Sequence, residues 1–175
     1  MKNSMVSNLP MRLRSFQPLF KLLQGLAFSS IVLANSLPAQ TDPINNNKII
    51  QQQLNEDAST LKTLVDKALA LEKQGKIKEA SENWERLIEL AEKNFGPFHP
   101  DIAPGLNKLG YLYYLQSEYN KAEAVYIRAL AIREKEFGPD HSSIASSLND
   151  LAEVYRVQAK YIKSEPLYIR SLAIY

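Results

Sequence analysis

From Asp57 onward, apolar residues recur every three or four positions, which is the spacing of one face of an α-helix. In the middle of the chain this stripe runs from Ile102 to Tyr113, and we expect Asp101 to cap the helix that carries it. A short polar turn, residues 116–118, follows. A second stripe then predicts a helix over about 119–136, with its inward positions at Ala122, Val125, Tyr126, Ala129, Leu130 and Ile132. The pattern therefore predicts a helical hairpin.

The hairpin pattern repeats every 42 residues. Residues 96–133 align with residues 138–175 without a gap, and 19 of the 38 pairs are identical. Gly138 and Pro139 are expected to end the second helix, because Gly permits the backbone turn and Pro prevents continuation. Small residues are expected where helices approach closely: Gly110, Ala122, Ala129, Ala152, Ser164 and Ser171. A repeat of this length predicts stacked hairpins.

The same register extends one unit upstream and places Trp84 under Tyr126. This gives repeats over about 57–95, 96–137 and 138–175, the last one truncated. Lys67 replaces an inner Leu in the first unit, as expected of a capping repeat. Trp84 has two interpretations, a ligand platform or a core residue at its repeat position, and the second is strongly favoured.

The first 40 residues differ from the rest of the chain. They hold four basic residues and no acidic one, and an apolar run of 13 residues, 22–34, is followed by small residues. Residues 1–39 are therefore predicted to be a signal peptide, or alternatively an uncleaved membrane anchor. Residues 40–56 are rich in Asn and Gln and are predicted to be a linker, with some helix after Asn47. The expected location is the periplasm or the outside of the cell.

Charge and composition exclude several kinds of function. The whole chain carries +2, but residues 41–175 keep 17 of the 21 basic residues and all 19 acidic ones, a net −2. Nucleic-acid binding is therefore not expected. The chain has no Cys, which excludes disulfides, thiolate metal sites and a lipid-bearing cysteine. His99 and His141 recur one repeat apart without further ligands nearby; we interpret them as residues that set helix starts, and expect no cofactor and no metal.

The repeats resemble those of the tetratricopeptide repeat family. The resemblance covers about residues 57–175 and is carried by residues 106–110, Tyr113, 116–119, 121–124, 126–132 and 138–141. The repeats are most similar to the 42-residue form found in kinesin light chains and in many cyanobacterial proteins. This resemblance implies an all-α fold, a right-handed α-solenoid of about three stacked hairpins. It also implies that the first helix of each hairpin lines a concave groove.

Carried over by position, the resemblance places groove residues on three successive helices. We expect the ligand to contact Lys73, Asn107, Tyr111, Tyr114, Asn149, Glu153 and Arg156, and the neighbouring positions Val65, Leu69, Glu72, Leu115 and Val157. The two Asn residues lie one repeat apart, and their amides can donate to and accept from a peptide backbone. An equally weighted alternative is that they only satisfy neighbouring helices. Glu72 and Glu153 oppose Lys73 and Arg156, so no carboxylate clamp is assigned.

Three hypotheses about function follow. The leading one is a non-catalytic, exported module that binds a protein or extended peptide in the groove. The second is the N-terminal arm of a longer enzyme, because arrays like this one often precede caspase-like CHAT domains. The third is self-association through Leu167, Ile169 or Leu172 of the last helix, since exposed apolar patches usually find a partner.

Overall fold

A computed structural model describes residues 43–174, and within the first 16 of these only the side chains of Gln52 and Glu56. The chain divides into two units, residues 1–58 and 59–175. The predicted signal peptide or anchor, residues 1–39, lies outside the described residues. Among the helices that are described, none combines the length and the apolar character needed to cross a membrane.

The described residues are helical and contain no strand. The α-helices are α3 (Pro43–Lys73), α4 (Ile77–Phe95), α5 (Ala103–Leu115), α6 (Tyr119–Phe137), α7 (Ser142–Val157) and α8 (Tyr161–Ile174), and a 3₁₀ turn, Pro100–Ile102, precedes α5. Helix α3 begins before Asn47 and is continuous past residue 57. The predicted boundary between linker and repeat domain therefore falls inside one helix.

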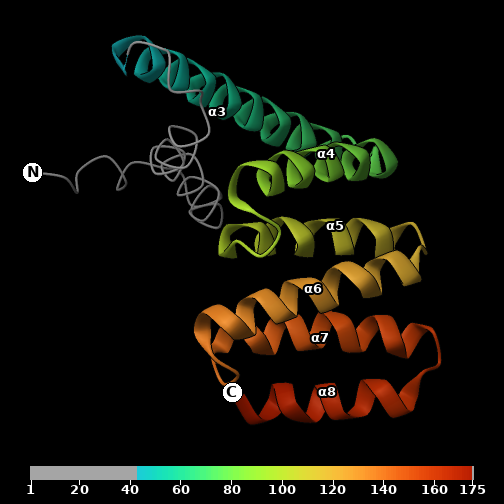
Figure 1. Cartoon of the computed structure of the whole chain (residues 1–175). Helices are drawn as coiled ribbons and strands as arrows, with labels where there is room; N and C mark the ends of the chain where they lie inside the picture. Colours follow the sequence, from blue (N-terminus) through green and yellow to red (C-terminus); the bar gives the residue numbers. More distant parts are fainter. Residues whose placement is uncertain (1–42, 175) are drawn as a thin grey trace, which may run out of the picture. The chain divides into compact units, whose positions relative to one another are not determined.

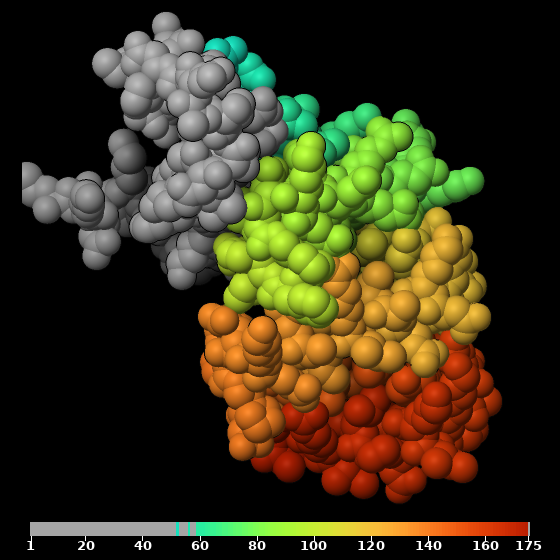
Figure 2. All heavy atoms as spheres, viewed as in Figure 1, coloured from blue at the N-terminus to red at the C-terminus, as the bar shows by residue number. Residues whose placement is uncertain are grey.

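Helices α4 to α8 lie one after another, each antiparallel to the next (Figure 1). Their atoms form consecutive bands in contact with one another (Figure 2). Short turns make successive helices neighbours, and each amphipathic helix buries its apolar side against the next. The predicted turn at residues 116–118 is confirmed, with Ser117 at φ 60° and its repeat counterpart Ala159 at φ 57°. Gly138 ends α6 at φ 83°, as predicted.

The core between these helices is built from residues at equivalent repeat positions. Trp84 is fully buried and Tyr126 is 4 % exposed, so the interpretation of Trp84 as a core residue is confirmed. The small residues predicted at close approaches are all buried. At Gly110, an added Cβ would lie 2.8 Å from the Tyr126 ring, so this position has no room for a larger residue.

The two His residues start helices, as predicted, but Asp101 does not cap its helix. The Nδ1 atom of His99 accepts a hydrogen bond from the Asp101 backbone N–H, and His141 accepts one from Ser143 in the same way. The cap prediction was wrong because a 3₁₀ turn, Pro100–Ile102, precedes α5. Asp101 lies inside this turn, and His99 is the residue that caps it. Among the described residues, no group of three His, Cys, Asp or Glu side chains is placed to hold a metal ion.

Candidate functional site

The candidate site is the side of α5 and α7 that neighbouring helices leave uncovered. We call it the α5–α7 face and define it as Asn107, Tyr111, Tyr114, Leu115, Asn149, Glu153, Arg156 and Val157. These are residues that the sequence predicted, and all are half-buried or exposed. Tyr111 is 51 % exposed and Leu115 45 % exposed, so this face presents two large apolar side chains to solvent.

A hydrogen-bonded network centred on Glu153 joins three helices at this face. The Tyr114 hydroxyl of α5 donates to Glu153 Oε1 over 3.2 Å, and the Tyr168 hydroxyl of α8 donates to Oε2 over 3.0 Å. Arg156 donates two bonds to the same carboxylate, at 2.7 and 2.6 Å. The network therefore holds Tyr114 in place and links successive hairpins.

These bonds keep Glu153 ionised. The hydrogen bond from Arg156 is the largest cause and, with those from Tyr168 and Tyr114, lowers the pKa of Glu153 to about 2. The opposition of Glu153 to Arg156 that the sequence predicted is thus confirmed. Arg156 is therefore paired with Glu153 through two of its guanidinium nitrogens.

The other predicted site residues take different positions. Asn107 lies on the face, but its Oδ1 atom is buried and has no hydrogen-bond partner among the described residues. This atom has no exposed surface, so half of the predicted amide clamp does not face solvent. Asn149 is half-buried on α7. Lys73 is exposed at the end of α3 and forms no ion pair within the described part of the chain.

Glu72 makes contacts that the sequence did not predict. It accepts hydrogen bonds from the Trp84 indole at 2.9 Å and from Lys108 at 2.8 Å. It is therefore bound to Lys108 rather than set against Lys73. The repeat register does not reveal this contact, because Tyr114, the counterpart of Glu72, bonds to Glu153 and not to Asp150, the counterpart of Lys108.

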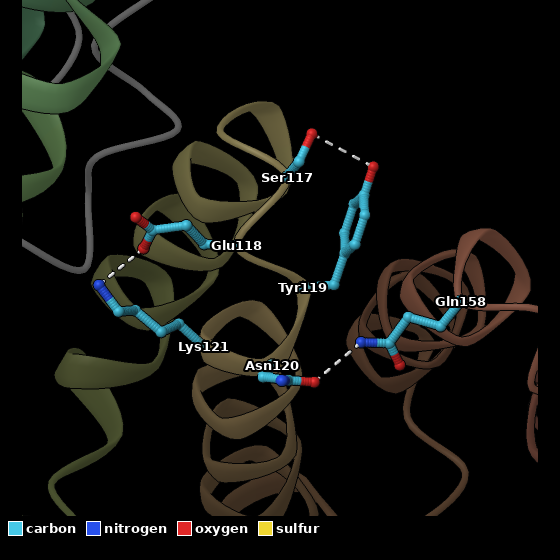
Figure 3. Close-up of a pocket in the computed structure, with 6 residues that line it drawn as sticks. All are labelled: Ser117, Glu118, Tyr119, Asn120, Lys121 and Gln158. Atoms are coloured by element: carbon cyan, nitrogen blue, oxygen red, sulfur yellow. Dashed lines mark hydrogen bonds and ion pairs between the residues drawn. The ribbon is translucent and has the colours of Figure 1, made fainter.

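A separate polar hollow of about 270 Å³ lies at the hairpin turns, lined by residues 117–121 and Gln158 (Figure 3). Its side chains mostly pair with one another: Lys121 with Glu118 at 2.7 Å, and Gln158 with Asn120 at 3.2 Å. None of these residues belongs to the α5–α7 face. The Gln158 Oε1 atom is buried without a hydrogen-bond partner among the described residues, but most of the polar groups here bond to one another, so the hollow is a poorer candidate site than the face.

Comparison with known proteins identifies the family. The profile described as "Tetratricopeptide repeat" matches residues 59–135 and again residues 101–175. Together these matches cover more than half of the chain, and the chain therefore belongs to the tetratricopeptide repeat family. No curated protein matches the sequence significantly.

Solved structures agree on the fold. A Podosopora anserina protein assigned to the kinesin light chains, with nearly identical TPR-like repeats, is 22 % identical with a TM-score of 0.58. The match covers 65 % of this chain and 54 % of that one, so the chain spans about half the length of that relative, and a variant of the same protein matches equally. BtubC (BKLC) from P. vanneervenii is 17 % identical over 89 % of this chain and 73 % of its own, with a TM-score of 0.60. The predicted α-solenoid of the kinesin-light-chain type is confirmed.

Proposed function

We propose that this chain is a non-catalytic protein-interaction module that binds an extended peptide along the α5–α7 face. The tetratricopeptide repeat fold supports an interaction scaffold, because stacked hairpins present long surfaces to partners. The observation that carries the proposal is the exposure of Tyr111 on α5, one turn before Tyr114, which the Glu153 network holds in place. Tyr side chains bury large area at low entropic cost, as binding hot spots do.

The test compares two exposed tyrosines. Tyr111→Ala removes the proposed anchor, whereas Tyr161→Ala removes a tyrosine that is 62 % exposed on α8, outside the face. Both variants and the wild type are used as bait on an envelope extract, and the captured proteins are quantified. We expect Tyr111→Ala alone to lose partners, because truncating a hot spot weakens binding by about 2 kcal/mol or more. Equal capture by all three baits would refute the proposal.

Self-association through α8 is a second candidate. Leu172 is 75 % exposed and Ile169 is 61 % exposed. Leu130, the repeat counterpart of Leu172, is half-buried on α6, which packs against α7. In a head-to-tail dimer, α8 of one copy would pack on α3 of the next and would bury Lys67. Lys67 is exposed, whereas its counterparts in the later repeats, Leu109 and Leu151, are buried apolar residues, so this arrangement is unfavourable. We therefore propose that α8 of one copy pairs with α8 of another.

Sedimentation tests this second proposal. The wild type is expected to form dimers that Leu172→Glu abolishes, because a charge in an apolar interface must be desolvated. Ile127→Glu is the control, since Ile127 is also partly exposed, at 45 %, but lies on α6. A wild-type monomer at high concentration contradicts the proposal.

We also propose that the chain is exported, on the basis of the signal-like composition of residues 1–39. N-terminal sequencing of the purified protein from fractionated cells tests this. A mature chain that starts after the small residues near position 39 supports a cleaved signal. An uncleaved chain in the membrane fraction supports the anchor, and an uncleaved chain in the cytoplasmic fraction contradicts export.

A further inference from the structure

Two successive hairpin interfaces carry opposite charges at the same repeat position. Between the first and second hairpins, Lys108 of α5 forms an ion pair with Glu72 of α3, with Nζ and Oε2 2.8 Å apart. One repeat later, Asp150 takes the place of Lys108, and Tyr114 takes the place of Glu72. The first interface is therefore neutralised by its own residues, whereas the second presents a carboxylate next to a tyrosine.

Asp150 has no ion-pair partner within 4.0 Å among the described residues. Arg133 of α6 attracts the Asp150 carboxylate electrostatically, but its guanidinium donates a hydrogen bond to Ser147 Oγ and forms no ion pair with Asp150 within 4.0 Å. Arg156, on the same helix as Asp150, is held by two hydrogen bonds to Glu153. Burial raises the pKa of Asp150 above 3.8, and this effect outweighs the attraction of Arg133. A cation brought by a ligand would relieve this unfavourable burial.

Two tyrosines of α5 lie beside this carboxylate. The Tyr114 hydroxyl bonds to Glu153 over 3.2 Å, and α5 and α7 run in the same direction (Figure 1), so one turn back on each helix brings Tyr111 level with Asp150. Tyr126 is held beneath α5 by its contact with Gly110, while Tyr111 is 51 % exposed at the surface. Aromatic rings attract cations through their π faces, and a carboxylate adds a charged acceptor. A lysine or arginine side chain offers both the positive charge and the apolar stem that this arrangement fits.

We propose that Asp150, flanked by Tyr111 and Tyr114, forms a subsite for a lysine or arginine side chain of the bound peptide. The inference rests on the proposed peptide-binding function of the α5–α7 face and specifies the chemistry of its ligand. A metal ion is a poorer occupant, because the described residues around Asp150 offer no second free carboxylate or imidazole at this point.

A displayed library of random 12-residue peptides tests the subsite. Selection is carried out in parallel on the wild type, on Asp150→Asn and on Asp140→Asn. Asp140 is an exposed carboxylate in the loop before α7 and is the matched control. Asn is nearly isosteric with Asp and removes only the charge. Circular dichroism and thermal unfolding confirm that each variant is folded before selection.

The proposal expects the wild type and Asp140→Asn to enrich peptides with Lys or Arg at one fixed position, and Asp150→Asn to lose that preference. Replacing the basic residue of an enriched peptide by Gln is then expected to weaken binding to the wild type by roughly tenfold and to leave binding to Asp150→Asn almost unchanged. This second measurement alters only the peptide and does not depend on the stability of a variant.

Two other outcomes are distinguishable. Enriched peptides without a fixed basic residue, or with the same preference on Asp150→Asn, overturn the subsite and leave binding at the face intact. If no peptide is enriched, or if enriched peptides bind Tyr111→Ala as well as the wild type, the proposed function fails and the subsite fails with it.

Discussion

Gly110 of α5 packs closely against the Tyr126 ring, whereas Gly105 of the same helix has room for a side chain. Adding one methyl group at each position, by Gly→Ala substitution, is therefore expected to have opposite effects on stability. A Cβ at Gly110 would lie 2.8 Å from two ring atoms of Tyr126 and 3.0 Å from a third. A Cβ at Gly105, in the same helix, would lie 3.5 Å from Ile88 and 3.6 Å from Trp84, which is ordinary contact. The two Gly→Ala substitutions therefore change helix propensity equally and packing very differently.

The expected magnitudes follow from these distances. Ala is favoured over Gly in a helix by about 1 kcal/mol, so Gly105→Ala is expected to raise the free energy of unfolding by up to about that amount. Overpacking a close-packed site costs roughly 1–3 kcal/mol, and Tyr126, which is 4 % exposed, has little space into which it can move. Gly110→Ala is therefore expected to lower stability by about 0–2 kcal/mol after the propensity gain.

Thermal and urea unfolding of the two variants measure this difference. The two variants differ by the overpacking cost of roughly 1–3 kcal/mol, and 1 kcal/mol shifts the midpoint of a domain of this size by roughly 4 °C, so their midpoints are expected to differ by about 4–12 °C. Replacing Tyr126 by Leu in the Gly110→Ala background is expected to recover part of the loss. Equal stability of Gly105→Ala and Gly110→Ala would refute the argument from packing.

Three further predictions concern stability. Asn83→Ala is expected to lower it by about 1–2 kcal/mol in urea unfolding, because the buried amide donates to the Leu64 carbonyl at 2.5 Å; an unchanged midpoint would contradict this. The contribution of Asp150 to stability is expected to fall as pH rises above 3.8, because the folded state binds its proton more tightly, whereas Glu153 with its lowered pKa contributes the opposite change; the difference in stability between the wild type and Asp150→Asn isolates the Asp150 contribution, and a variant less stable than the wild type at pH 7 would argue against unfavourable burial. Ala159→Gly is expected to gain about 0.5–1 kcal/mol in thermal unfolding, because φ is 57° where the first hairpin has Gly75 at 70°; no gain would show that the turn is unstrained.

The sequence determined the fold because a 42-residue repeat constrains every level of structure at once. Helix spacing, the turn at residues 116–118, the helix end at Gly138 and the burial of Trp84 all follow from local periodicity and from equivalence between repeats. The start of α5 did not follow. Asp101 is a good capping residue by type, but the backbone geometry of the preceding 3₁₀ turn gives that role to His99.

The sequence also placed the candidate residues on α5 and α7, because helix faces are set by position in the repeat. What these side chains do depends on partners far away in the chain. Tyr114 and Glu153 are 39 residues apart, and Lys108 and Glu72 are 36 apart; these pairs form because stacked hairpins bring equivalent positions together. Only the tertiary structure shows that Arg156 is already occupied and that the Oδ1 atom of Asn107 is buried. The periodicity of the chain thus placed its residues on the helix faces, whereas the packing of one hairpin on the next decided which charged groups form ion pairs and which, like Asp150, do not.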